Sequence, residues 1–183
     1  MNITVFLGAK MGEDQMYMME VQDLGRWIAK NGHRLIYGGS RIGLMGALAD
    51  AVLEAGGEVI GIVPDFFLQQ HTEHQGLTDL ITTETMAERR DKMIEMGDAF
   101  IAFPGGTGTL EEISEVISRK HLGRTDKPVS LLNIEGFYSP LRSMLEKMVE
   151  EGFLDRSDLN KVYFANTVDA STWYLQSDMR LSR

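Results

Sequence analysis

The sequence predicts an α/β fold with a three-layer, Rossmann-like, doubly wound and mainly parallel sheet. Short β-branched runs alternate with longer segments of helical period, and this alternation is typical of a parallel sheet with helices on both faces. Glycine or proline closes several of the segments. The 183 residues, 43% of them hydrophobic, suffice for one substantial core and contain no linker or internal repeat. We therefore expect a single domain over residues 1–183.

The N-terminal half predicts three strands separated by two helices. In order, these are a strand at 3–7, a helix at about 14–31, a strand at 34–37, a helix that ends near 55 and a strand at 58–63. Gly32 ends the first helix, and Gly56 with Gly57 ends the second. Pro64 closes the third strand because it has no N–H to donate to a neighbouring strand.

The C-terminal half continues the alternation after a polar loop at about 68–76. Its segments are a strand at 80–83, a helix at 86–96, a strand at 99–103, a helix that ends near 122, a strand at 129–132, a helix at 137–150, a strand at 162–164 and a helix from about 169. Sheets of this kind bind ligands at the carboxyl ends of their strands. The turns that follow the strands are therefore the first places to search for a site.

Composition restricts the partners of the protein. The 18 Lys and Arg against 27 Asp and Glu give a net charge of −9, which disfavours binding to nucleic acid phosphates. Because the chain contains no cysteine, disulfides, thiolate nucleophiles and cysteine-bound metals are excluded, and a reducing cytoplasm is compatible with this composition. No apolar run is long enough for a membrane span. We expect a cytoplasmic protein that binds neither nucleic acid nor membrane.

The most informative segment is Ala102–Glu112, where an apolar strand enters a glycine-rich turn that opens into a helix. Glycines let backbone N–H groups approach a phosphate, and the helix adds unpaired N–H groups and the positive end of its dipole. The pattern therefore predicts a phosphate site. An alternative is that Thr109 and Glu112 form a capping box, in which Glu112 only accepts a bond from a backbone N–H.

A second glycine-rich turn spans Gly38–Gly46 after another predicted strand. It does not match the G-x-G-x-x-G fingerprint of dinucleotide-binding proteins, and the chain has no P-loop motif. Two glycine turns at the carboxyl ends of strands instead favour a mononucleotide held between them, with its phosphate on one turn and its sugar or base near the other.

Four blocks resemble the Lonely Guy family of cytokinin-activating nucleoside 5′-monophosphate phosphoribohydrolases. Tyr37–Gly46 is similar to YGGG-x-x-GLMG, 57–64 to GGEVIGVIP, Met86–Met93 to MHERK-x-x-M, and Pro104–Glu112 fits PGG-x-GT-x-x-E without a mismatch. The resemblance covers about residues 3–153. It implies cleavage of an adenosine-type monophosphate into free base and ribose 5-phosphate, by a homodimer that needs no cofactor or metal. Members are often labelled lysine-decarboxylase-like, but that chemistry normally needs pyridoxal phosphate on a lysine.

The resemblance also implies site residues. Arg89 and Glu112 are the expected catalytic residues. The expected substrate-binding residues are Gly8, Gly39, Met86, Arg90, Gly105, Gly106, Thr107, Gly108, Thr109 and Glu111. Cleavage of an N-glycosidic bond builds positive charge on the sugar, so a carboxylate such as Glu112 suits the reaction. Glu111 lies about 100° away on a helix and is expected to contact ribose hydroxyls or a neighbouring chain.

Several alternatives remain open. Arg89 is also compatible with a solvated helix face on which Glu88 pairs with Lys92. Methionines at helical spacing, such as Met86 and Met93, are explained by core packing or a dimer seam. A non-catalytic binder related to molybdenum-cofactor carriers would use the same phosphate turn, and a single-stranded DNA binder is disfavoured by the net charge.

The chain departs from the family pattern at several positions. Ser40 replaces a common glycine, Arg90 replaces the usual lysine, and Gly8-Ala9-Lys10 stands where Gly-Ser-Ser is common. His71 lies about where relatives have an acid that contacts the ligand, so base preference is open. His71 and His74 are interpreted as polar loop residues, because no third ligand is spaced to complete a metal site.

Overall fold

A computed structural model describes residues 1–181, which form a three-layer α/β fold around a seven-stranded sheet. Every pairing between its strands is parallel, and the strand order is β4-β3-β2-β1-β5-β6-β7. The strands are β1 (Asn2–Phe6), β2 (Arg34–Tyr37), β3 (Glu58–Pro64), β4 (Asp79–Thr83), β5 (Ala99–Ala102), β6 (Val129–Leu132) and β7 (Val162–Ala165). The predicted fold class is confirmed.

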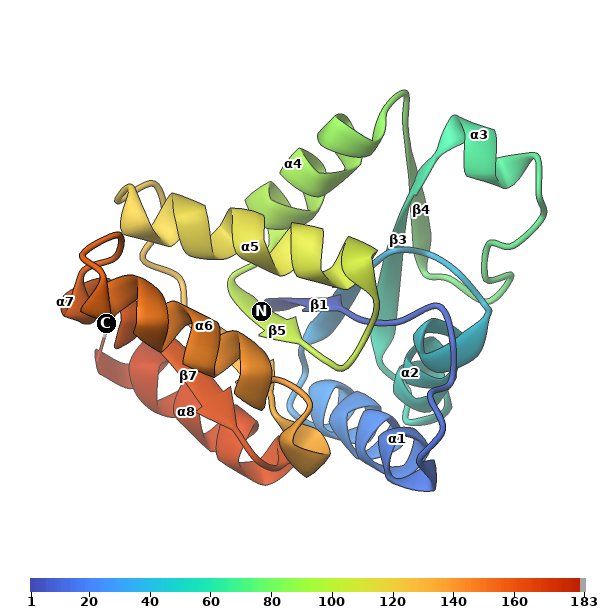
Figure 1. The fold of residues 1–183 in the computed structure, drawn as a ribbon. Coiled ribbons are helices and arrows are strands. Elements are labelled where there is room, and N and C mark those ends of the chain that lie inside the picture. Colours follow the sequence, from blue (N-terminus) through green and yellow to red (C-terminus); the bar gives the residue numbers. More distant parts are fainter. Residues whose placement is uncertain (182–183) are drawn as a thin grey trace.

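The helices alternate with the strands (Figure 1). They are α1 (Gln15–Lys30), α2 (Gly43–Glu54), α3 (Asp65–Leu68), α4 (Met86–Met96), α5 (Thr107–His121), α6 (Ser139–Glu150), α7 (Arg156–Leu159) and α8 (Val168–Leu181), with a 3-10 turn, η1, at Ile134–Gly136. The sequence analysis missed α3, α7 and η1. A segment of three or four residues makes a single turn, which is too short to carry a helical period.

Helices cover both faces of the sheet (Figure 1), and an apolar cluster lies on each face. On one face, α1, α2 and α8 pack against the strands through residues such as Leu24, Leu48 and Leu175. On the other face, α4 and α5 contribute buried residues that include Met93 and Val116. Because both faces are covered, every residue of β5 and β6 is buried, including the polar Ser130 of β6.

Methionine packing is settled for the helix α4. Met93 is 1% exposed in the core, and Met96 packs against the same cluster. Core packing therefore explains these two residues, while Met86 borders the cavity described below. Within residues 1–181, no helix combines the length and the apolar character that crossing a bilayer requires.

The direction in which successive strands are added to the sheet reverses at β1. From β1 the chain proceeds outward through β2, β3 and β4, and it then returns to β5 on the other side of β1. At such a switch point the loops after the two adjacent strands diverge and leave a crevice at the carboxyl edge of the sheet. The loop that begins near Gly8 and the loop that begins near Phe103 border this crevice.

Candidate active site

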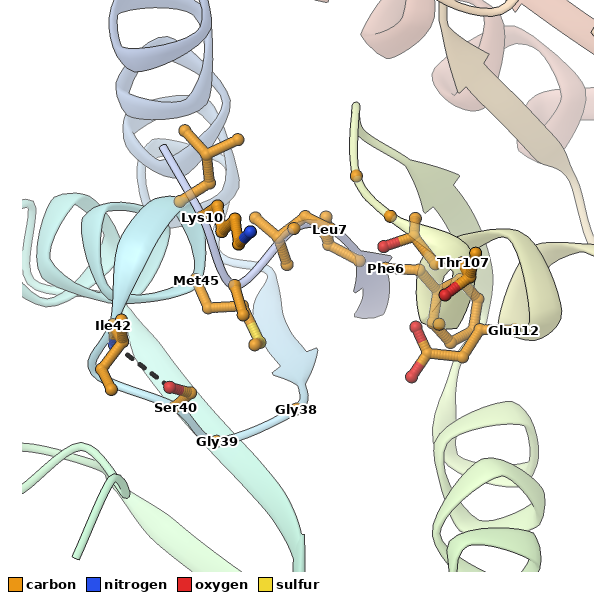
Figure 2. Close-up of a pocket in the computed structure, with 18 of the residues that line it drawn as sticks. Phe6, Leu7, Lys10, Gly38, Gly39, Ser40, Ile42, Met45, Thr107 and Glu112 are labelled. Atoms are coloured by element: carbon orange, nitrogen blue, oxygen red, sulfur yellow. Dashed lines mark hydrogen bonds between the residues drawn. The ribbon is translucent and has the colours of Figure 1, made fainter. Parts of the chain in front are cut away.

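A cavity of about 730 Å³ opens at the carboxyl ends of the central strands. Both predicted glycine turns line it, one after β2 and the other after β5. In Figure 2, Gly38, Gly39 and Ser40 lie on one side of the space with Met45 and Lys10 above them, Thr107 and Glu112 lie on the other side, and Leu7 lies between the two. This volume is in the range of pockets that hold small molecules.

The turn after β5 is built to present backbone N–H groups. α5 begins at Thr107 with Gly106 as its N-cap residue, and no side chain within residues 1–181 caps this end. The N–H groups of the first turn are therefore free to bind an anion. Glycine is required at Gly105, because a Cβ atom there would lie 2.2 Å from Thr109 Oγ1 and 2.8 Å from the backbone nitrogen of Gly8.

The capping-box interpretation of Thr109 and Glu112 is wrong. Thr109 is the third residue of α5 rather than its N-cap, and Glu112 Oε1 accepts a hydrogen bond from Arg89 Nη1 at 2.8 Å. A comparable capping arrangement lies instead at the start of α4, where the Glu88 backbone N–H donates to Thr85 Oγ1 at 3.1 Å. The carboxylate of Glu112 is therefore not used to cap its helix.

Arg89 and Glu112 form an ion pair beneath the cavity. Both side chains are only 9% exposed, so the interpretation of Arg89 as part of a solvated helix face is wrong. Arg89 Nε also donates to the carbonyl oxygen of Ile62 at 3.0 Å. The guanidinium fits because glycine follows strand β2: a Cβ atom at Gly38 would lie 2.1 Å from Arg89 Nη2.

Burial governs the electrostatics of the pair. Desolvation raises the pKa of Glu112 above its ordinary value, while the charge and hydrogen bond of Arg89 oppose that rise. Tyr138 donates its hydroxyl proton to the carbonyl oxygen of Phe103 at 2.9 Å, and burial, with the charge of Glu112, raises its pKa as well. Tyr138 therefore remains a donor that holds the end of β5.

Arg90 and Glu111, the sequence neighbours of Arg89 and Glu112, form a different set of contacts. Arg90 Nη1 lies 3.0 Å from Glu111 Oε1, and Arg90 Nε donates to Glu115 Oε2 at 3.0 Å. Arg90 lies outside the cavity lining. The other predicted site residues all line it: Arg89, Glu112, Gly8, Gly39, Met86, Gly105, Gly106, Thr107, Gly108, Thr109 and Glu111. Their binding of a ligand stays a prediction.

The cavity also has lining residues that the sequence analysis did not select. Among them are Lys10 and Tyr17 from the N-terminal segment, and Glu73 from the loop after α3. The position of Lys10 directly after the central strand was the available signal. Glu73 had none, because its place depends on a bridge to Ser40 that joins distant parts of the chain.

The two loop histidines have structural contacts. His74 Nε2 lies 2.9 Å from Asp50 Oδ1, and the Gly76 backbone N–H donates to His74 Nδ1 at 3.0 Å. The carbonyl oxygen of His71 accepts long bonds of 3.4 Å from the side chain of Arg41. Among residues 1–181, no group of three or more His, Asp or Glu side chains is arranged to hold a metal ion.

The chain is similar to several known proteins. A family model described as "possible lysine decarboxylase" matches residues 45–175. A cytokinin riboside 5′-monophosphate phosphoribohydrolase of Rhodococcoides fascians is 41% identical, over 96% of this chain and 89% of the relative. Another of that name, from Arabidopsis thaliana, is 42% identical over 83% of this chain and 71% of the relative.

Two solved structures with the same fold are named as molybdenum-cofactor proteins rather than as phosphoribohydrolases. A molybdenum cofactor binding protein from Rippkaea orientalis superposes with a TM-score of 0.74 at 24% identity, over 97% of this chain and 96% of that one. A molybdenum cofactor carrier protein from Chlamydomonas reinhardtii gives 0.74 at 23% identity, over 98% and 97%. At these identities the likeness establishes the fold alone.

Proposed function

The chain belongs to the Lonely Guy family of cytokinin riboside 5′-monophosphate phosphoribohydrolases, and from this premise we propose that it hydrolyses adenosine-type 5′-monophosphates. The products are the free base and ribose 5-phosphate. The substrate class includes AMP and its N6-modified derivatives. The family description names an amino-acid decarboxylase, but the similar proteins that carry an enzyme name are nucleotide hydrolases.

One observation carries this proposal: a buried carboxylate and an uncapped helix N-terminus face the same cavity. Glu112 and the turn at Gly105–Thr109 both line it. A phosphate bound to the N–H groups of the turn brings the attached sugar over the first turns of α5. Glu112, five residues after the start of the helix at Thr107, then lies beneath that sugar.

The proposed reaction uses Glu112 as an ionised group. As the bond between the anomeric carbon and the base nitrogen breaks, positive charge develops on the ribose ring, and the carboxylate stabilises it. Water attacks the anomeric carbon and transfers a proton to Glu112, while the bonding electrons leave with the base. The base takes up a proton from solvent and Glu112 releases its proton to solvent, so one water is consumed and Glu112 is ionised again. The raised pKa of Glu112 makes it a better proton acceptor than an exposed glutamate.

Arg89 serves as a positioning and binding group in this mechanism. A guanidinium remains charged at any physiological pH and is a poor proton donor. Its bonds to Glu112 and to the Ile62 carbonyl fix the orientation of the carboxylate. We propose that no metal or organic cofactor takes part, so that a chelator such as EDTA leaves the rate unchanged.

The direct test is to incubate the purified protein with AMP and with isopentenyl-AMP, and to separate the free base by chromatography. We expect equal amounts of base and ribose 5-phosphate from at least one substrate, and no product from Glu112→Ala. If neither nucleotide yields base while calorimetry still detects nucleotide binding, the protein is a non-catalytic binder of phosphorylated ligands and the hydrolase proposal is wrong.

Two further properties follow from the family resemblance as proposals. We propose a homodimer, which sedimentation at micromolar concentration tests: a mass of one chain contradicts it. We also propose a cytoplasmic location, which the absence of cysteine from the sequence supports. Cell fractionation that recovers the protein outside the cytoplasm contradicts that location.

A further inference from the structure

Lys10 places an ammonium group in the cavity that no other described residue neutralises. It follows β1 and lines the cavity together with the phosphate turn. Figure 2 shows its nitrogen pointing toward the space between the two glycine turns. Within the described part of the chain, Lys10 has neither an ion pair nor a side-chain hydrogen bond.

Three of the other four charges that line the cavity are held in ion pairs. Arg89 pairs with Glu112, and Glu111 pairs with Arg90 of α4. The fourth, the anion Glu73, accepts a hydrogen bond from Gln75 Nε2 at 3.2 Å through Oε1, while its buried Oε2 has no hydrogen-bond partner among the described residues. Lys10 is therefore the lining cation that can meet the charge of a ligand without breaking an existing pair.

The backbone at Lys10 is held close to the phosphate turn and to the start of α2. The Gly8 N–H donates to the carbonyl oxygen of Pro104 at 3.2 Å. A Cβ atom at Gly43, the first residue of α2, would lie 2.9 Å from the Lys10 backbone nitrogen. This packing fixes the base of the side chain, so the long aliphatic stem has only to direct its ammonium toward the turn.

A phosphate monoester needs such a cation in this protein. The monoester carries a charge between −1.5 and −2 at neutral pH, and the chain has a net charge of −9, so the overall field opposes binding. Backbone N–H groups provide direction but no full charge. A lysine supplies a compact positive charge that contacts phosphate without demanding a fixed geometry.

We propose that Lys10 is a specificity-determining residue that binds the 5′-phosphate and so selects nucleotides over nucleosides. This inference rests on the proposed function and assigns a role to a position where the sequence departs from the family pattern. Lys10 contributes to ground-state binding of the phosphate. It takes no part in breaking the glycosidic bond.

The test compares Lys10→Met with Lys10→Arg and with Lys30→Met. Lys30 is an exposed residue at the end of α1, so Lys30→Met removes the same charge away from the cavity. We measure KM and kcat for AMP, and the inhibition constants of ribose 5-phosphate and of adenine. Circular dichroism checks that each variant is folded.

We expect Lys10→Met to raise the KM for AMP and the inhibition constant of ribose 5-phosphate, each by about 10- to 30-fold, because one charge-assisted hydrogen bond to phosphate is lost. The kcat and the inhibition constant of adenine stay within about twofold, Lys10→Arg recovers most of the loss, and Lys30→Met resembles the unaltered protein.

Three results would overturn the inference: an unchanged constant for ribose 5-phosphate in Lys10→Met, an equal weakening of adenine, or the same loss in Lys30→Met. Failure of the proposed function is separate from these outcomes. In that case the unaltered protein does not cleave AMP, and direct calorimetric binding of ribose 5-phosphate to the same variants still decides the role of Lys10.

Discussion

Two ion pairs that are adjacent in sequence join α4 to α5, and they lie in different environments. Arg89 pairs with Glu112, and both side chains are 9% exposed. Arg90 pairs with Glu111, and these side chains are 19% and 57% exposed. A step of one residue along each helix rotates a side chain by about 100°, which here separates a buried pair from one at the surface.

The difference teaches that burial, rather than residue type, determines what an ion pair can do. Water screens the pair of Arg90 and Glu111, so its strength is modest and sensitive to salt. The pair of Arg89 and Glu112 has lost most of its water, so each charge depends on the other. The buried carboxylate therefore has the raised pKa and fixed orientation that its proposed catalytic role requires.

The largest expected effect is on stability. Arg89→Met leaves the buried Glu112 without its partner, so we expect a loss of about 3–5 kcal/mol in the free energy of unfolding, measured in urea at neutral pH. Arg90→Met should cost at most about 1 kcal/mol. The double variant Arg89→Met with Glu112→Leu should recover much of the loss, because no unpaired charge remains. Equal costs for the two arginine variants would refute the comparison.

The next effect is on catalysis. Glu112→Gln keeps the shape of the side chain and an acceptor for Arg89 but removes the negative charge, so we expect kcat for AMP to fall about 10²- to 10³-fold, measured as release of free base. Glu111→Gln is the matched control and should reduce kcat by less than about fivefold, because its carboxylate pairs with Arg90. If kcat falls further in Glu111→Gln than in Glu112→Gln, Glu111 rather than Glu112 is the catalytic acid.

The pH profile sharpens the comparison further. The proposed reaction needs ionised Glu112, so activity should fall as the pH drops through the raised pKa of this group, with an acidic limb above the ordinary value of 4.5. The charge of Glu111 raises this pKa and that of Arg90 lowers it. Glu111→Gln should therefore move the limb toward lower pH, and Arg90→Met toward higher pH. Shifts in the same direction would contradict the electrostatic assignment.

The smallest effect concerns salt. The coupling between Arg90 and Glu111, obtained from a double-mutant cycle of unfolding free energies, should be below about 1 kcal/mol and should shrink between 0.05 M and 1 M salt, because ions screen exposed charges. The corresponding cycle for Arg89 and Glu112 should change little over the same range. Equal salt sensitivity in the two cycles would show that both pairs are reached by solvent.

Local patterns were sufficient for much of the fold and for part of the site. The order of the long helices and strands was predictable because each carries its own period and its own end signals. The turn at Gly105 was recognisable because close approach of a backbone to an anion requires glycine, and that requirement is local. One-turn helices such as α3 and α7 escaped prediction because they are too short to have a period.

The sequence by itself determined the α/β class, the two glycine turns and the family, because these depend on neighbouring residues or on contiguous blocks. Only the tertiary structure decided that Glu112 faces Arg89 rather than capping its helix, that Arg90 lies outside the cavity lining, and that Lys10 points into the cavity. Each of these facts is a contact or an orientation between segments far apart in the chain. Such contacts follow from the packing of α4 and α5 on the sheet, and no local pattern encodes them.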